Sequence, residues 1–261
     1  MNRTRKLLDD LASGKITADE AEKQLQALSL HNVGELALID VNRGVRSGIP
    51  EIVYGESKDA EDIVQIIRSI LTVNNVALVT RLTQEKLNIL LNNFKDLEIE
   101  VFGKSPILTA LVYNENWEMP KTGGRVAIIT AGTSDIPYAK EAEALAKLVG
   151  VEVFSYYDIG VSGIHRLIEP IREIIEKDVD VLIVFAGMEG ALPTVVAALV
   201  EIPVIGVPVP TGYGFGGKGE TALASMLQSC SPGLAVVNIG NGLGAASVAS
   251  LIAKRAAKNR S

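Results

Sequence analysis

Residues 181–193 read VLIVFAGMEGALP and carry the clearest fold signal of the chain, because an unbroken apolar run leads through a glycine-containing turn into a Leu-Pro pair. A strand that is buried on both faces is apolar throughout, whereas a strand with one solvated face alternates between apolar and polar residues. Proline is common in the first turn of a helix. We therefore predict a strand of a parallel sheet at 179–185, followed by a helix at 190–200.

The same rhythm extends over the carboxyl-terminal half of the chain. Strands are predicted at residues 125–130, 151–155, 179–185, 203–207 and 233–238, and helices at about 136–149, 163–177, 190–200, 219–228 and 243–257. This pattern is typical of a three-layer α/β domain, in which helices cover both faces of a parallel sheet. Ligands bind such sheets at the carboxyl ends of the strands, so a site is expected in the loops that follow them.

The first part of the chain predicts a smaller α/β domain with a helical start. A helical pair is expected over residues 4–28, where Thr17 and Glu20 have the spacing of a capping box. Short β-like runs at 36–41, 52–54, 76–79 and 97–102 are interspersed with helical stretches at 59–71 and 83–94, and a linker follows at 113–124. The predicted domains are residues 1–120 and 121–261.

Composition excludes several classes of protein. The 261 residues are 48% hydrophobic and carry 25 Lys and Arg against 31 Asp and Glu, for a formal net charge of −6. An acidic chain binds nucleic acid poorly, and a single cysteine excludes both internal disulfides and a Cys-based structural metal site. No apolar signal core or uninterrupted membrane span of about 20 residues is found. We therefore expect a cytoplasmic protein that binds neither nucleic acid nor membrane.

Two of the loops after predicted strands contain carboxylates. The stretch AGTSD at 131–135 opens a helix, where small residues let an anion approach the backbone amides; a simple N-cap turn is the alternative interpretation. In the loop after 179–185, Glu189 lies among glycine and apolar neighbours, where burial would raise its pKa and the helix N-terminus would lower it again. An acid in that place is a better candidate for chemistry than a surface charge.

Other loop residues have both a structural and a functional interpretation. The glycine-rich loop at 208–219 is either a flexible connection or a shaped lid over a ligand. His165, near a helix start, is more often a cap than a catalyst, and a free cysteine such as Cys230 is more often an inert apolar residue. Arg43 and Arg46 are suited to forked binding of carboxylate or phosphate, but solvated surface arginines fit the spacing equally well.

Residues 125–256 resemble the PurE fold, that of carboxyaminoimidazole ribonucleotide mutase. The resemblance rests on Ser134-Asp135 at a helix start, His165-Arg166, Leu192-Pro193 and PVIGVP at 203–208. The chain departs from PurE in two loops. AGTSD replaces Gly-Ser-x-Ser-Asp, and MEGA at 188–191 stands where PurE has Ala-His before Leu-Pro.

Over nearly its whole length the chain resembles the LarB family, the nickel-pincer nucleotide biosynthesis carboxylase/hydrolases. The matching stretches are residues 40–58 with Arg43, Arg46 and Pro50-Glu51, AGTSD at 131–135, YDIGVSGIHR at 157–166, AGMEGALP at 186–193, GYG at 212–214, and Ser229-Cys230 leading to Val237-Asn238. Gly240 departs from the family, whose Asn-Ile-Asp-Asn-Gly pattern has an acid at that position.

The resemblance implies a substrate and a reaction. Nicotinic acid adenine dinucleotide would be carboxylated on its pyridinium ring by CO2 or bicarbonate, and its phosphoanhydride would be hydrolysed. The products would be AMP and pyridinium-3,5-biscarboxylic acid mononucleotide. Mg2+ is expected to arrive with the substrate phosphates. The resemblance also suggests a homo-oligomer, with an octamer as the expected form.

The resemblance also implies residue roles. Cys230 is the expected nucleophile, Glu189 the expected base, and His165 and Asp135 are expected to assist orientation or proton transfer. The expected substrate-binding residues are Asp40, Arg43, Arg46, Lys58, Arg81, Gly132, Thr133, Ser134, Arg166, Gly187, Met188, Gly212, Tyr213, Gly214 and Asn238. Two alternatives stay open: a PurE-type enzyme acting on aminoimidazole ribonucleotides, which needs no cysteine, and a dinucleotide-binding sensor without turnover.

Overall fold

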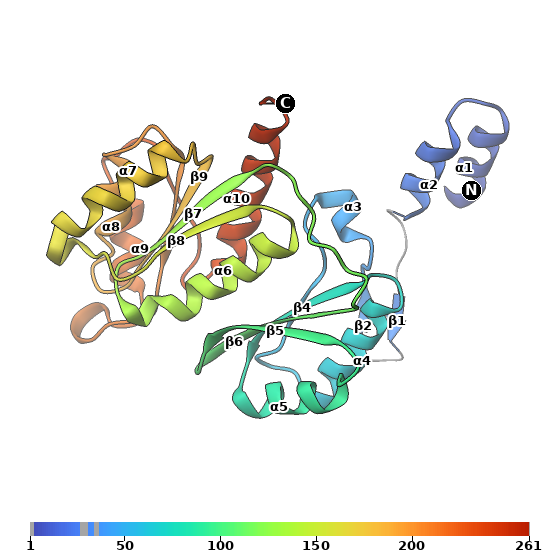
Figure 1. The fold of residues 1–261 in the computed structure, drawn as a ribbon, viewed down its shortest axis with the longest axis horizontal. Coiled ribbons are helices and arrows are strands. Elements are labelled where there is room, and N and C mark those ends of the chain that lie inside the picture. Colours follow the sequence, from blue (N-terminus) through green and yellow to red (C-terminus); the bar gives the residue numbers. More distant parts are fainter. Residues whose placement is uncertain (1–2, 27–30, 34–36, 261) are drawn as a thin grey trace.

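The structure is a computed structural model that describes residues 3–26, 31–33 and 37–260. Its carboxyl-terminal domain is built on a five-stranded parallel sheet (Figure 1). Its strands are β7 (Arg125–Thr130), β8 (Glu152–Tyr156), β9 (Val181–Ala186), β10 (Val204–Pro208) and β11 (Leu234–Val236). They are ordered β8-β7-β9-β10-β11, and each neighbouring pair is parallel. The five predicted strands and the doubly wound fold are confirmed, and this order has its topological switch point between β7 and β9.

Helices cover both faces of this sheet. They are α6 (Ile136–Leu148), α7 (Ile168–Glu176), α8 (Leu192–Ala197), α9 (Glu220–Leu227) and α10 (Gly242–Ala257), with 3-10 turns η1 (Thr133–Asp135), η2 (Val161–Leu167) and η3 (Gly214–Gly216). The apolar residues of α6 and α10 share a core with one face of the sheet, and those of α7, α8 and α9 share a core with the other.

Two predicted helices are shorter in the structure than expected. The helix predicted at 163–177 is divided, because Gly163 has non-helical backbone angles inside η2 and α7 begins only at Ile168. The helix predicted at 190–200 begins at Leu192, after a turn in which Met188 and Gly190 have positive φ angles.

The amino-terminal domain has a four-stranded sheet of order β3-β4-β6-β5, with β3 and β4 parallel and the other pairs antiparallel. Its elements are β3 (Ile52–Tyr54), β4 (Val76–Leu82), β5 (Glu98–Lys104), β6 (Ile107–Tyr113), α3 (Arg43–Ser47), α4 (Ala60–Leu71) and α5 (Gln84–Asn93). A hairpin of β1 (His31–Val33) and β2 (Ala37–Ile39) precedes them. Sequence analysis missed β1, α3 and the buried strand β6, although residues 107–113 are a β-like apolar run.

The helical start consists of α1 (Arg3–Ala12) and α2 (Ala18–Gln26); the end of the predicted pair, residues 27–28, lies outside the described residues. The predicted capping box is confirmed. The backbone amide of Glu20 donates to Thr17 Oγ1 at 3.2 Å, and the amide of Thr17 donates to Glu20 Oε2 at 2.8 Å. Among the described helices, none has the length and apolar character needed to cross a membrane.

Helix α6 joins the two domains, because it packs against both sheets. Its buried alanines belong to the same core as Leu78 of β4 and Leu111 of β6, and also as Ile128 and Ile183 of the parallel sheet. Small side chains at positions such as Ala142 and Ala146 let both sheets approach the helix closely. Helix α6, which begins directly after Asp135, is therefore held from both sides.

Candidate active site

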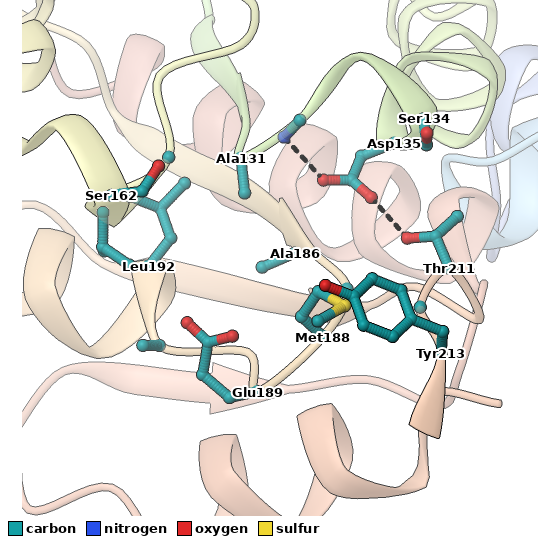
Figure 2. A pocket seen from close by; sticks show the side chains of 16 residues that line it. Ala131, Ser134, Asp135, Ser162, Ala186, Met188, Glu189, Leu192, Thr211 and Tyr213 are labelled. Carbon is teal, nitrogen blue, oxygen red and sulfur yellow. Dashed lines mark hydrogen bonds between the residues drawn. The ribbon is translucent and has the colours of Figure 1, made fainter. Parts of the chain in front are cut away.

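The principal cavity, of about 430 Å3, lies beyond the carboxyl ends of β7 and β9. These strands flank the switch point of the sheet, where ligands of open α/β sheets bind. Its lining comes from the loops after β7, β8, β9 and β10 (Figure 2): Ala131, Gly132, Ser134, Asp135, Gly160, Val161, Ser162, Ala186, Gly187, Met188, Glu189, Ala191, Leu192, Thr211, Gly212 and Tyr213. The cavity therefore brings together eight predicted site residues, namely Gly132, Ser134, Asp135, Gly187, Met188, Glu189, Gly212 and Tyr213.

Asp135 is the buried acid of this cavity, with 3% of its surface exposed. Its carboxylate accepts hydrogen bonds from the backbone amide of Gly132 at 2.9 Å and from Thr211 Oγ1 at 2.8 Å (Figure 2). Burial raises the pKa of Asp135, and the hydrogen bonds from Gly132, Thr211 and the Gly187 amide oppose that rise. A buried carboxyl group with a raised pKa in a cavity is a candidate for proton transfer to or from a bound molecule.

Glu189 is exposed, although its neighbours in sequence are glycine and apolar residues. Gly190 follows it with a φ of +66° and α8 begins only at Leu192, so the loop carries Glu189 at the rim. Figure 2 shows the two carboxylates on opposite sides of the opening, with Ala186 between them. The cavity therefore has one buried and one exposed acid.

Thr211 is the important cavity residue that sequence analysis missed. It comes directly before the predicted Gly212-Tyr213-Gly214 stretch, and its hydroxyl fixes Asp135 from the neighbouring loop. Gly187 makes room for it, because a Cβ there would lie 2.1 Å from Thr211 Oγ1 and 2.3 Å from its carbonyl oxygen. The glycine of the β9 loop therefore permits the Thr211–Asp135 contact.

Substituting Gly187 with alanine is expected to displace Thr211 and to lower the free energy of unfolding by about 1–3 kcal/mol, as overpacking usually does. Urea denaturation of both proteins measures the difference. Gly132→Ala is the matched control, since a Cβ there meets nothing nearer than Asp135 Oδ2 at 3.8 Å. Equal stability of the two variants would contradict the role given to Gly187.

A smaller cavity of about 280 Å3 contains two further predicted residues, Arg81 and Asn238. It lies where the carboxyl ends of β3 and β4 meet the start of α10. Arg81 donates to Glu141 Oε1 at 3.0 Å and to the carbonyl oxygen of Gly240 at 2.6 Å. In this chain the glycine at position 240 therefore contributes its backbone oxygen to Arg81, and the charge of Arg81 is balanced by Glu141.

Cys230 does not line either of these cavities, and its side chain is exposed. It lies in the turn between α9 and β11, at the amino end of β10, where the amide of Val204 donates to the carbonyl of Gly233. Ser231 Oγ donates to the carbonyl oxygen of Thr194 in α8, the helix whose first residue, Leu192, lines the principal cavity. The predicted nucleophile and the predicted acids are therefore separate within one chain.

The predicted residues of the β8 loop also lie outside the cavity. His165 is exposed in η2. Arg166 folds back on its own loop, where it donates to the carbonyl oxygen of Asp158 at 2.6 Å and pairs with the Asp158 carboxylate at 3.5 Å. Thr133 and Gly214 likewise do not belong to the lining.

The predicted basic residues of the amino-terminal domain are elsewhere. Arg46 forms an ion pair with Asp40, and Arg43 lies 3.5 Å from Glu51; both arginines are on α3. Lys58 lies in the turn after β3. The principal cavity is lined by none of the four predicted residues of this region, which are Asp40, Arg43, Arg46 and Lys58.

In the part of the chain that the structure describes, no group of three or more His, Cys, Asp and Glu side chains is placed to hold a metal ion. The principal cavity contributes two carboxylates, Asp135 and Glu189. A divalent ion at this site would need most of its ligands from the substrate and water.

Two family models match separate regions of the chain. Residues 125–260 match the model of AIR carboxylase, and residues 30–109 match the model of the LarB/PurE-like N-terminal domain. The first region contains the principal cavity, and the second contains α3, β4 and Arg81.

Individual relatives match either nearly the whole chain or about half of it. A Methanocaldococcus jannaschii protein with the name "Uncharacterized protein MJ0165" is 46% identical over 253 residues, which are 96% of each chain. The N5-carboxyaminoimidazole ribonucleotide mutase of the same organism is 36% identical over 116 residues, covering 44% of this chain and 68% of the mutase. The corresponding mutase of Pyrococcus abyssi is 35% identical over 128 residues, covering 47% of this chain and 66% of that mutase.

Proposed function

Since the chain belongs to the AIR carboxylase family and carries a LarB/PurE-like N-terminal domain, we propose that it carboxylates the pyridinium ring of nicotinic acid adenine dinucleotide and hydrolyses its phosphoanhydride. The observation that carries the proposal is the union of these two domains in one chain, with a cavity containing two acids at the switch point of the carboxylase domain. Membership of the family makes the chain a carboxylase- or mutase-type enzyme; the choice of substrate is the proposal.

The proposed chemistry starts from the electron deficiency of a pyridinium ring, which does not attack CO2 by itself. Addition of the Cys230 thiolate to the ring gives an enamine whose carbon meta to nitrogen is nucleophilic. That carbon forms a bond to CO2, a base removes its proton, and departure of the thiolate restores aromaticity. The ring has then exchanged a hydrogen for a carboxylate, and the thiolate is regenerated.

We assign the proton transfer to Asp135 in place of the first candidate, Glu189. Asp135 is buried, its pKa is raised by that burial, and Thr211 and the Gly132 amide fix its position. Glu189 is exposed on the other side of the opening, where it can orient the substrate. In the second reaction, water cleaves the phosphoanhydride to release AMP, and the substrate's Mg2+ would polarise the phosphates.

The experiment is an incubation of the protein with nicotinic acid adenine dinucleotide, bicarbonate and Mg2+, followed by mass spectrometry. We expect two products. One is AMP, and the other is a mononucleotide heavier by one carboxyl group than the nicotinic acid mononucleotide half of the substrate. Aminoimidazole ribonucleotide is the parallel substrate, because the mutases named above are 36% and 35% identical to part of this chain. Turnover of aminoimidazole ribonucleotide but not of the dinucleotide would favour a PurE-type enzyme over the proposal. Binding of the dinucleotide without any turnover would favour a dinucleotide-binding sensor.

Cys230→Ala is expected to lose carboxylation entirely, because no other side chain of this chain is a thiol. Mass spectrometry of the same incubation measures the loss, and Ser229→Ala serves as the control in the same turn. Carboxylation that survives in Cys230→Ala would contradict the thiol mechanism while leaving the family assignment intact.

We further propose that the active enzyme is a homo-oligomer in which the Cys230 turn of one copy approaches the cavity of another, with an octamer as the expected form. The separation of Cys230 from Asp135 within one chain supports this, as do the exposed apolar side chains Val248, Leu251 and Ile252 of α10. Light scattering measures the mass of the assembly.

Mixing two inactive variants tests the shared site directly. Cys230→Ala and Asp135→Asn, unfolded together and refolded as mixed oligomers, are expected to recover part of the activity, because some cavities then receive both intact residues. The unmixed variants, refolded separately, are the controls. A monomer in solution, or mixed oligomers without activity, would contradict a shared site.

A further inference from the structure

A second cavity of about 430 Å3 lies at the other end of the carboxyl-terminal domain, between the two domains. It is lined by Leu148 at the end of α6 and by Lys254 in the last turns of α10. The principal cavity and the cavity at Arg81 lie instead beside the beginnings of these two helices. The amino-edge cavity, as we call the space lined by Asn42, Glu51, Asn75, Trp117, Leu148 and Lys254, is therefore distinct from the proposed active site.

The cation of the amino-edge cavity is Lys254, and among the described residues no acid forms an ion pair with it. Lys254 Nζ donates to the carbonyl oxygen of Gly48 at 3.0 Å, and no carboxylate of a described residue lies within ion-pair distance of it. Glu51 also lines the cavity, but its charge is shared with Arg43 at 3.5 Å. Burial, with a contribution from Lys258, lowers the pKa of Lys254. A partly buried ammonium without a counter-charge favours an anionic ligand.

The rest of the lining suits a flat ring. Trp117 lines the cavity, and its ring centroid lies 4.9 Å from that of Tyr113. Asn42 precedes α3, and its side chain makes no hydrogen bond to any other described residue, so its amide is available to a ring heteroatom. Val41, Val76 and Leu78 contribute apolar walls. An aromatic surface with a few fixed polar groups is the usual composition of a small-molecule site.

We infer that the amino-edge cavity binds a planar heterocycle carrying one anionic group, with that group paired to Lys254 and the ring placed against Trp117. The inference does not depend on the proposed function, because none of its residues lines the principal cavity. The ligand joins residues of both domains and so stabilises their arrangement.

Trp117 is the single tryptophan of the chain, so its fluorescence reports on this cavity. The full-length protein is titrated with AMP and with nicotinate, each carrying one acidic group on a heterocyclic skeleton. Adenosine and nicotinamide are the matched uncharged controls, and inorganic phosphate is the control without a ring. We expect saturable fluorescence changes with AMP, nicotinate or both, and at least tenfold weaker binding of the uncharged partners and of inorganic phosphate. Binding of AMP would identify the anionic group of the ligand as a phosphate, and binding of nicotinate would identify it as a carboxylate.

Variants assign the response to the cavity. Lys254→Gln keeps a donor for Gly48 but removes the charge, and we expect it to weaken binding about tenfold or more, the usual effect of losing a charged hydrogen bond. Lys254→Arg keeps the charge and is expected to retain binding, and Asp135→Asn in the principal cavity is expected to leave the titration unchanged. Three results would each overturn the inference. They are the absence of any saturable response, binding of adenosine and nicotinamide as tight as that of AMP and nicotinate, and binding that Lys254→Gln does not weaken.

Discussion

Replacing Asp135 with asparagine is expected to lower carboxylation by about 10²–10⁴-fold, the usual contribution of a positioned acid or base. Asparagine has nearly the same shape and can keep hydrogen bonds to Gly132 and Thr211, but it cannot take up a proton. The measurement is the initial rate of product formation by mass spectrometry. Ser134→Ala, which alters an exposed neighbour in the same cavity, is the control and is expected to lose much less.

The same substitution is expected to stabilise the protein at neutral pH. Burial raises the pKa of Asp135 in the folded state, so folding favours its protonated form. The stability that this proton provides is complete below the unfolded-state pKa and is lost as pH rises through the folded-state pKa. The asparagine amide cannot ionise, so the Asp135→Asn variant does not lose stability as pH rises through the folded-state pKa of Asp135. Urea denaturation across pH tests this: the advantage of Asp135→Asn should appear as pH rises through the raised pKa and vanish in acid.

A contradictory result would be an active Asp135→Asn, which would transfer the proton-transfer role to Glu189. Full activity with Glu189→Gln and none with Asp135→Asn would support the assignment made here. The wild-type activity should also fall in acid at a higher pH than an ordinary aspartate would give, because the ionised form is the base. Loss of activity together with loss of stability would show instead that Asp135 is needed mainly for folding.

Removing the carboxylate of Glu141 is expected to cost about 3–5 kcal/mol of unfolding free energy, because it leaves Arg81 partly buried without a counter-charge. Glu141 is 1% exposed on α6, and it accepts hydrogen bonds from Thr80 Oγ1 at 2.5 Å and from Arg81 Nε at 3.0 Å. Arg81 belongs to β4, so this ion pair joins the two domains. Urea denaturation of Glu141→Ala measures the cost.

Two variants show whether burial is the cause. Glu169→Ala removes an ion pair with Arg172 whose side chains are 65% and 60% exposed, and we expect it to cost less than about 1 kcal/mol. The double variant Arg81→Met with Glu141→Leu replaces the buried pair by apolar side chains, and it is expected to recover most of the stability lost in Glu141→Ala. Similar costs for Glu141→Ala and Glu169→Ala would contradict the anchoring role of Glu141.

The parallel sheet could be predicted from the sequence because its signal is local. Strands buried on both faces consist of continuous apolar runs, such as residues 181–185, and glycine and proline mark the turns between strands and helices. The Thr17–Glu20 capping box was predictable for the same reason, since both partners are three residues apart. The missed strand β6 had such a signal, whereas the short helix α3 in a glycine-rich stretch had none.

Site residues were predictable only where the topology gathers them. Loops after parallel strands meet at one edge of a sheet, so Asp135, Glu189 and Tyr213 could be expected together although they are far apart in sequence. Exposure was not predictable in the same way. Glu189 has apolar neighbours in sequence, yet the positive φ of Gly190 and the late start of α8 leave it at the rim. Asp135 became the buried acid because Thr211 and Gly132 enclose it.

The alternation of strands and helices in the second domain, its doubly wound class and the loops in which a site must lie could be read from the sequence alone, because each depends on interactions between near neighbours. Which acid is buried, the pairing of Arg81 with Glu141, and the separation of Cys230 from Asp135 within one chain became visible only in the folded structure. These facts depend on contacts between residues distant in sequence. Such contacts are fixed only when α6 is packed between the two sheets.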